Sequence, residues 1–112
     1  MLDYDLPALA DVRAWLGVPA TVLDDAQLAQ VLDAEAAIQG RQVTIPRDDL
    51  DAPYLTADLV QALYRRVGRE IAAKGVPLGV VGVDAEYGPT RLTSWDAEID
   101  RLEASRRRFV FA

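Results

Sequence analysis

"TADLVQALYRRVGREIAAKG", residues 56–75, is the stretch that decides the fold. Its apolar residues recur at intervals of three and four, and this spacing predicts an amphipathic helix with a wide apolar stripe. Thr56 is the expected N-cap, while Gly75 and Pro77 are expected to end the helix. The stripe comprises Leu59, Val60, Leu63, Tyr64, Val67 and Ile71. A stripe this wide must be buried, which predicts that other helices pack against it.

Two helices are predicted before this stretch. The first is short, runs from about Ala8 to Leu16, and is stopped by the glycine and proline that follow. The second begins in "LDDAQL", residues 23–28, where Asp24 and Gln27 have the spacing of a capping box. It is expected to end near Gly40. Residues 41–55 hold two prolines, so we expect an extended connection there with room for a short strand.

The predicted fold is mainly α, with residues 1–75 as a three-helix core domain. Residues 76–93 are rich in glycine and predict an arm that could form a β-hairpin. Residues 94–112 predict a separate C-terminal helix followed by a docking tail. Only Ile99 and Leu102 mark the apolar side of that helix, so little burial against its own domain is expected.

Composition limits the function. A chain of 112 residues has room for one domain, and it contains neither cysteine nor histidine. These absences remove thiolate chemistry, the commonest general base and the commonest metal ligand, so no enzyme, metal or cofactor is expected. We expect no membrane association either, because the apolar runs are short and the first residues are acidic where a signal peptide is basic.

The net charge of −6 is unevenly distributed. Residues 1–64 hold 11 acids and 3 bases, a net charge of −8, whereas residues 65–112 hold 7 acids and 9 bases, a net charge of +2. The face of the third helix opposite its apolar stripe carries Arg65, Arg66, Arg69 and Lys74. Of these, Arg65, Arg66 and Arg69 are candidates for a subunit interface. They could meet the acidic part of a neighbouring copy in a head-to-tail contact. The alternative is a solvent-exposed face with local ion pairs.

The chain closes on "RRRFVFA", residues 106–112. Ordering these residues costs about 7–14 kcal/mol of backbone entropy, while burying the apolar tripeptide returns about 5–9 kcal/mol. The segment is therefore expected to become ordered only with further hydrogen bonds, as when a peptide binds in a partner's groove. The candidate docking residues are Arg106, Arg107, Arg108, Phe109, Val110 and Phe111; the alternative is a frayed, solvated end.

The order of these segments resembles the head-tail adaptor (connector) proteins of tailed bacteriophages. The most distinctive pieces are "LYRRV" at 63–67, "GVPLG" at 75–79 and "DAEIDRLEASRRR" at 96–108. The resemblance implies a small helical domain repeated as a homo-oligomeric ring of about twelve copies under the portal. It also implies that residues 106–111 reach into the phage portal protein, and that the next neck or tail component binds elsewhere on the ring. DNA would pass through the lumen without sequence-specific binding. The protein would be assembled in the host cytoplasm and reside in the neck of the virion.

Two other functions remain open. A small helical DNA-binding regulator would use the second and third helices, with Arg65 and Arg66 at the bases. The acidic second helix and the long gap before the third disfavour it. A small hydrolase would need two carboxylates in a pocket, and the sequence shows no sign of a pocket.

Overall fold

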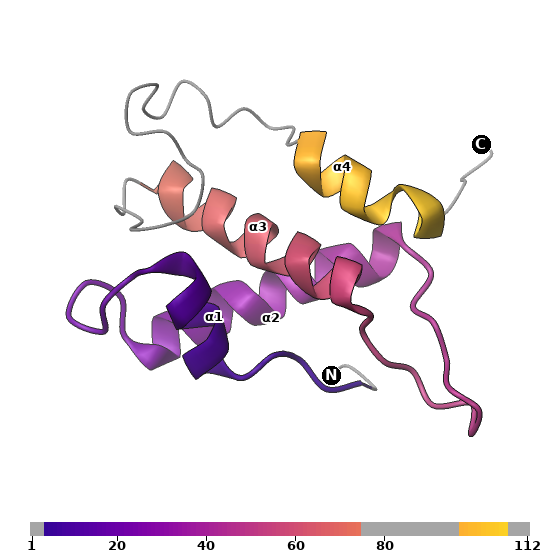
Figure 1. The fold of residues 1–112 in the computed structure, drawn as a ribbon. Helices are drawn as coiled ribbons and strands as arrows, with labels where there is room; N and C mark the ends of the chain where they lie inside the picture. The colour runs from indigo at the N-terminus through magenta and orange to yellow at the C-terminus, as the bar shows by residue number, and fades with distance from the viewer. Residues whose placement is uncertain (1–3, 75–96, 108–112) are drawn as a thin grey trace.

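The computed structural model describes residues 4–74 and 97–107. These residues form four α-helices and a short 3₁₀ helix, and their β structure is limited to two isolated bridges (Figure 1). The mainly α class is thus confirmed. The predicted glycine-rich arm, residues 76–93, lies outside the described residues. The elements are α1 Leu9–Leu16, α2 Asp25–Gln42, α3 Ala57–Ala73, α4 Ala97–Glu103 and the 3₁₀ helix Ala104–Arg106.

A single arginine holds the corner between α1 and α2. Gly17 ends α1 with a left-handed φ of 67°, a conformation that glycine adopts without strain. The Arg13 guanidinium then donates to the carbonyls of Val18, at 3.2 Å, and Leu23, at 2.8 Å, and pairs with Asp25 at 2.7 Å. These contacts satisfy backbone carbonyls of the turn that would otherwise lack partners.

The capping box predicted at the start of α2 is confirmed. The Gln27 backbone N–H donates to the Asp24 carboxylate at 2.8 Å, and the Asp24 N–H donates to the Gln27 side-chain oxygen at 3.1 Å. The predicted end near Gly40 is two residues early. Gly40 lies inside the helix, where an added Cβ would be 3.4 Å from the Tyr4 hydroxyl, and the helix ends only where Val43 becomes extended.

The core lies between α1, α2 and α3, with α2 and α3 antiparallel (Figure 1). Thr56 is the N-cap of α3 as predicted, but its hydroxyl donates to the Asp58 carboxylate rather than capping a backbone amide. Leu63, Val67 and Ile71 of the predicted apolar stripe of α3 belong to the buried core cluster, which confirms this part of the stripe. The other residues of the cluster are Val12, Leu16, Val18, Leu23, Leu28, Leu32 and Ala36.

The C-terminal helix is not separate from the bundle, which corrects the sequence-based prediction. Helix α4 packs alongside α3 (Figure 1), and Ile99 is only 4% exposed. The prediction failed because it counted only apolar residues. Burial of the Glu103 side chain supplies the rest of the contact.

Candidate functional site

A buried ion pair joins α3 to α4. Arg66 is 3% exposed and Glu103 is fully buried. The guanidinium donates to both carboxylate oxygens of Glu103, at 2.7 and 2.6 Å, in the bidentate arrangement that gives the strongest charge-assisted hydrogen bonds. Such a pair fixes orientation because neither charge can leave it without remaining buried and unpaired.

Two glutamines from α2 complete this network. The Gln39 side-chain amide donates to Glu103 and to the carbonyl of Leu59, each at 3.0 Å. The Gln42 side-chain oxygen accepts from Arg66 at 2.6 Å. Residues from three helices therefore meet at one buried carboxylate, and we call this set (Gln39, Gln42, Arg66 and Glu103) the polar anchor.

The first residues of the proposed docking tail are fixed on the same side of the domain. The Thr44 N–H donates to the Arg106 carbonyl at 2.7 Å, and Arg107 forms an antiparallel bridge with Val43. The Arg106 side chain lies 3.6 Å from Asp58. Arg106 and Arg107 thus join the chain just after α2, and the hydrogen bonds that hold these two residues come from the chain itself.

Arg107 is held by two carboxylates. Its guanidinium lies 3.1 Å from the Asp100 carboxylate and 3.5 Å from the Glu103 carboxylate. The expectation that ordering begins only on a partner is therefore wrong for Arg106 and Arg107. The remaining docking candidates, Arg108, Phe109, Val110 and Phe111, lie outside the described residues.

The three candidate interface arginines of α3 have different surroundings. Arg66 belongs to the polar anchor, so its assignment to a subunit interface is wrong: a side chain 3% exposed has no surface to offer a neighbouring copy. Arg65 and Arg69 are half-buried and border the surface. The burial of Arg66 also weakens the DNA-binding alternative, because that reading needs this side chain at base edges.

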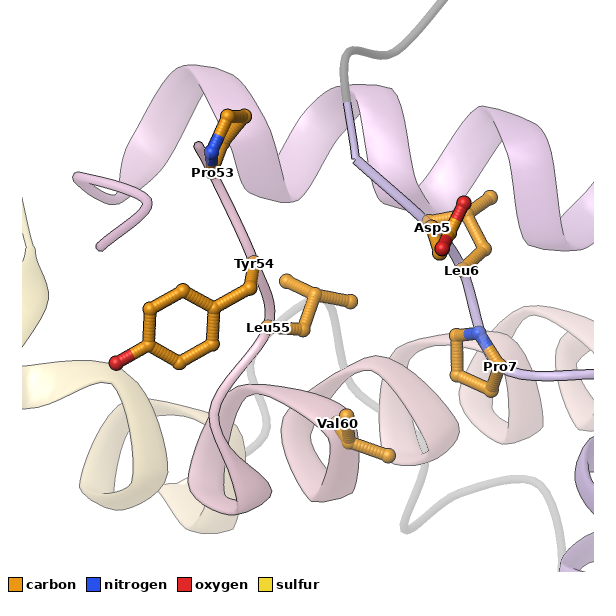
Figure 2. A pocket seen from close by; sticks show the side chains of 7 residues that line it. All are labelled: Asp5, Leu6, Pro7, Pro53, Tyr54, Leu55 and Val60. Atoms are coloured by element: carbon orange, nitrogen blue, oxygen red, sulfur yellow. The ribbon is translucent and has the colours of Figure 1, made fainter. Parts of the chain in front are cut away.

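One surface depression lies between the N-terminal segment and the loop before α3. It measures about 410 Å³ and is lined mainly by apolar side chains. Figure 2 shows Leu6 and Pro7 on one side, Tyr54 and Leu55 on the other, and Val60 of α3 beneath them. Tyr54 is 43% exposed, so this depression offers an open apolar surface with an aromatic edge.

A second depression, the α2–α3 groove, measures about 340 Å³. Its lining residues are Gln30, Val31, Ala34, Glu35, Ile38, Glu70 and Lys74. Burial raises the pKa of Glu35 above its ordinary value of 4.5, and the negative charge of Glu70 adds to the effect; the cations Arg66, Arg69 and Lys74 oppose it. Glu70 pairs with Lys74 at 3.5 Å.

The α2–α3 groove supplies the pocket and the two carboxylates that the hydrolase alternative requires. The rest of its lining is mainly aliphatic, so the groove suits an apolar side chain better than a reacting substrate. Among the described residues, no group of acids has the arrangement of a metal site. Nor is any helix within those ranges long and apolar enough to cross a membrane.

The loop between α2 and α3 carries a feature that the sequence analysis missed. Residues 44–56 project from the bundle (Figure 1) and turn back on themselves, with a bridge between Arg47 and Pro53. At the tip, Leu50 is 88% exposed. The signal in the sequence was "DDLD", residues 48–51, an isolated leucine between acids in a segment without helical periodicity.

Comparisons of the chain with protein-family models, with curated proteins and with solved structures found no match.

Proposed function

We propose that this chain is a structural head-tail adaptor of a tailed bacteriophage. About twelve copies form a ring under the portal, the C-terminal segment binds the portal protein, and DNA passes through the lumen. The observation that carries the proposal is the fixation of Arg106 and Arg107 on the domain, which gives the residues after them a defined starting point. The resemblance in the order of the segments supports it independently.

The anchored arginines divide the tail into two parts. Arg106 and Arg107 hold the chain to Asp58 and Asp100, so the docking role falls to Arg108 and the apolar residues 109–111. An arm that leaves from a fixed point loses less freedom on binding than one whose attachment is itself free to move.

A ring of such arms binds more tightly than any one of them. Once one arm is seated, the others face their sites at a high effective concentration. The net charge of −6 also suits a channel for DNA, because a surface poor in cations does not hold phosphate groups. A structural adaptor needs neither a catalytic centre nor a cofactor.

The test is portal binding by a chain that lacks residues 108–112. We expect the truncated chain to keep its thermal unfolding midpoint and to bind the portal protein of the same phage at least about 100-fold more weakly. Arg101→Ala is the matched control, because it removes an exposed arginine of α4 that pairs with Glu98 outside the tail. Undiminished portal binding by the truncated chain would contradict the proposal.

A further inference from the structure

We propose that the loop at residues 44–56 is a second portal-binding element, beside the C-terminal segment. Leu50 at its tip fills an apolar recess of the portal protein, and the acids around Leu50 face Lys or Arg side chains at the rim of that recess. The inference rests on the proposed function and adds a contact to it.

Both ends of the loop are tied to the start of the C-terminal segment. At the first end, the Thr44 N–H donates to the Arg106 carbonyl at 2.7 Å. At the other end, the Arg106 side chain lies 3.6 Å from Asp58, two residues after the loop. The loop projects from the end of the bundle at which α2 and α4 both end (Figure 1). A protein that binds the residues after Arg107 would therefore bind beside the base of this loop.

The tip is held in one conformation before any partner binds. The Asp51 N–H donates to the Asp48 carbonyl at 3.0 Å, which closes a β-turn. The Asp48 carboxylate accepts from the backbone N–H groups of Leu50, at 2.9 Å, and Ala52, at 3.0 Å. Asp51 has a left-handed φ of 62°, and its carbonyl accepts from the Arg47 guanidinium at 2.7 Å. A tip fixed in this way loses little conformational freedom on binding.

The loop carries most of the large apolar side chains that the described residues expose. Leu50 is 88% exposed, Val22 46% and Tyr54 43%, and Leu50 and Tyr54 both belong to the loop. The turn uses only the backbone N–H of Leu50, so its hydrogen bonds do not require a leucine. Burial of this side chain on another protein would remove its apolar area from water and so stabilise a complex.

The chain's own depressions do not suit this tip. The depression beside the N-terminal segment has Asp5 in its lining. The α2–α3 groove has Glu35 and Glu70 in its lining, and the cation there, Lys74, pairs with Glu70. Both linings would repel the acids beside Leu50. A second copy of the chain is therefore a poorer recipient for the tip than a different protein.

The charge of the tip indicates what this protein must present. Residues 47–51 hold one base and three acids, a net charge of −2. The turn uses the Asp48 carboxylate, and the Asp51 carboxylate lies 3.9 Å from the Arg47 side chain. Asp49 and Asp51 are both exposed. A recess that receives the tip therefore needs cations at its rim, because a neutral or acidic rim would leave these carboxylates uncompensated.

The two elements would act together. Once the C-terminal segment is bound, the tip faces its recess at a high effective concentration. A segment that leaves the domain at one point does not fix the angle between domain and partner, whereas a second contact does. We therefore expect loss of the tip contact to weaken portal binding less than loss of the segment, and to act mainly by faster dissociation.

The first test is portal binding by Leu50→Ser. We expect an unchanged thermal unfolding midpoint and binding about tenfold weaker. Val22→Ser is the matched control, because Val22 precedes the start of α2 and the loop follows its end, about 27 Å away along an 18-residue helix. Undiminished binding by Leu50→Ser would overturn the inference. The proposed function would still stand if deletion of residues 108–112 abolished binding.

Charge reversal tests the rim of the recess. Asp49→Lys should lower the rate of association with the portal about two- to fivefold, with a larger effect at low ionic strength. Asp33→Lys is the control, because it makes the same change in net charge at an exposed position of α2. An equal reduction by both variants would overturn the assignment of a basic rim.

Photo-cross-linking identifies what the tip touches. The natural sequence has no cysteine, so Leu50→Cys can carry a single benzophenone group. In the complex we expect a cross-link to the portal protein, and none from Val22→Cys labelled in the same way. A cross-link to a second copy of the chain, or only to the next neck component, would overturn the inference. If the natural chain does not bind the portal at all, the proposed function and this inference fail together.

Discussion

Helices α3 and α4 are both packed into the bundle, but by different kinds of contact. Helix α3 buries a continuous apolar stripe that includes Leu59, Leu63 and Val67. Helix α4 is only seven residues long and buries Ile99 together with the carboxylate of Glu103. The stripe gives α3 nondirectional stability, whereas the polar anchor gives α4 one orientation. The proposed adaptor role requires a tail that leaves from a defined point, and the orientation of α4 would supply it.

Breaking the polar anchor should produce the largest effect. We expect Glu103→Leu to lower the free energy of unfolding by about 3–5 kcal/mol, because it leaves the Arg66 guanidinium buried without its partner. The double variant Arg66→Met/Glu103→Leu should recover most of this loss, since it removes both charges. Urea unfolding followed by circular dichroism measures both.

The outcome that would contradict this view of α4 is a double variant no more stable than the single one. That result would mean that removing the ion pair also disrupts the apolar contacts of α4. The packing of α4 would then depend on apolar contacts as the packing of α3 does.

Removing an apolar side chain should lower the free energy of unfolding more in α3 than in α4. We expect Leu63→Ala in α3 to cost about 2–5 kcal/mol, because the side chain is fully buried and its removal leaves a cavity. Leu102→Ala in α4 should cost about 1 kcal/mol, because that side chain is only half-buried. Equal losses in urea unfolding would show that α4 relies on apolar packing as much as α3 does.

The sequence predicted the apolar packing of α3 but not the polar contact that holds α4. Local patterns sufficed for the first helix, for the capping box at Asp24 and for the stripe of α3, because each depends on residues close in sequence. The Arg66–Glu103 pair joins residues 37 positions apart, and no local pattern matches two such partners.

A signal for that pair was nevertheless present. Arg66 follows Leu59 and Leu63 at the spacing of the apolar stripe, so its position predicts burial although its charge suggests exposure. Glu103 likewise follows Ile99 by four residues. A charged residue at an apolar position of each of two helices is the pattern that would have placed α4 on the bundle. The tip of the 44–56 loop left no comparable signal beyond an isolated leucine among acids.

Glu35 differs from both the buried apolar residues and the buried ion pair. It is a buried carboxylate near cations, but it lacks a bidentate partner such as the one that Glu103 has. Its folded-state pKa is raised, mainly by burial, so the ionised form is disfavoured in the folded protein. The penalty is absent below the ordinary value of 4.5 and grows as the pH rises through the folded-state pKa. We therefore expect Glu35→Gln to be more stable than the natural sequence at pH 7, with a difference that shrinks toward pH 4.

Unfolding midpoints measured between pH 4 and pH 8 test this prediction. Asp33→Asn is a suitable control, because it removes a carboxylate from an exposed position of the same helix. A stability difference that stays constant across the pH range would show that the Glu35 carboxylate is not disfavoured by its surroundings.

The smallest expected effect concerns the link between the start of α3 and the segment after α4. The Thr56 hydroxyl lowers the pKa of Asp58 below its ordinary value of 3.8, with further help from the Leu59 backbone N–H and the charge of Arg106. A lowered folded-state pKa contributes stability above pH 3.8 that is lost as the pH falls through the folded-state value. Because the Asp58 side chain is 36% exposed and solvent screens the pair, we expect this loss to stay below about 1 kcal/mol.

The Asp58→Asn variant should lack this pH-dependent loss of stability, whereas the control variant Asp49→Asn, at the exposed loop tip, should retain it. If Asp58→Asn destabilised the protein as strongly as Glu103→Leu, the attachment of Arg106 would matter as much as the polar anchor, and α4 would be held at two equivalent points instead of one.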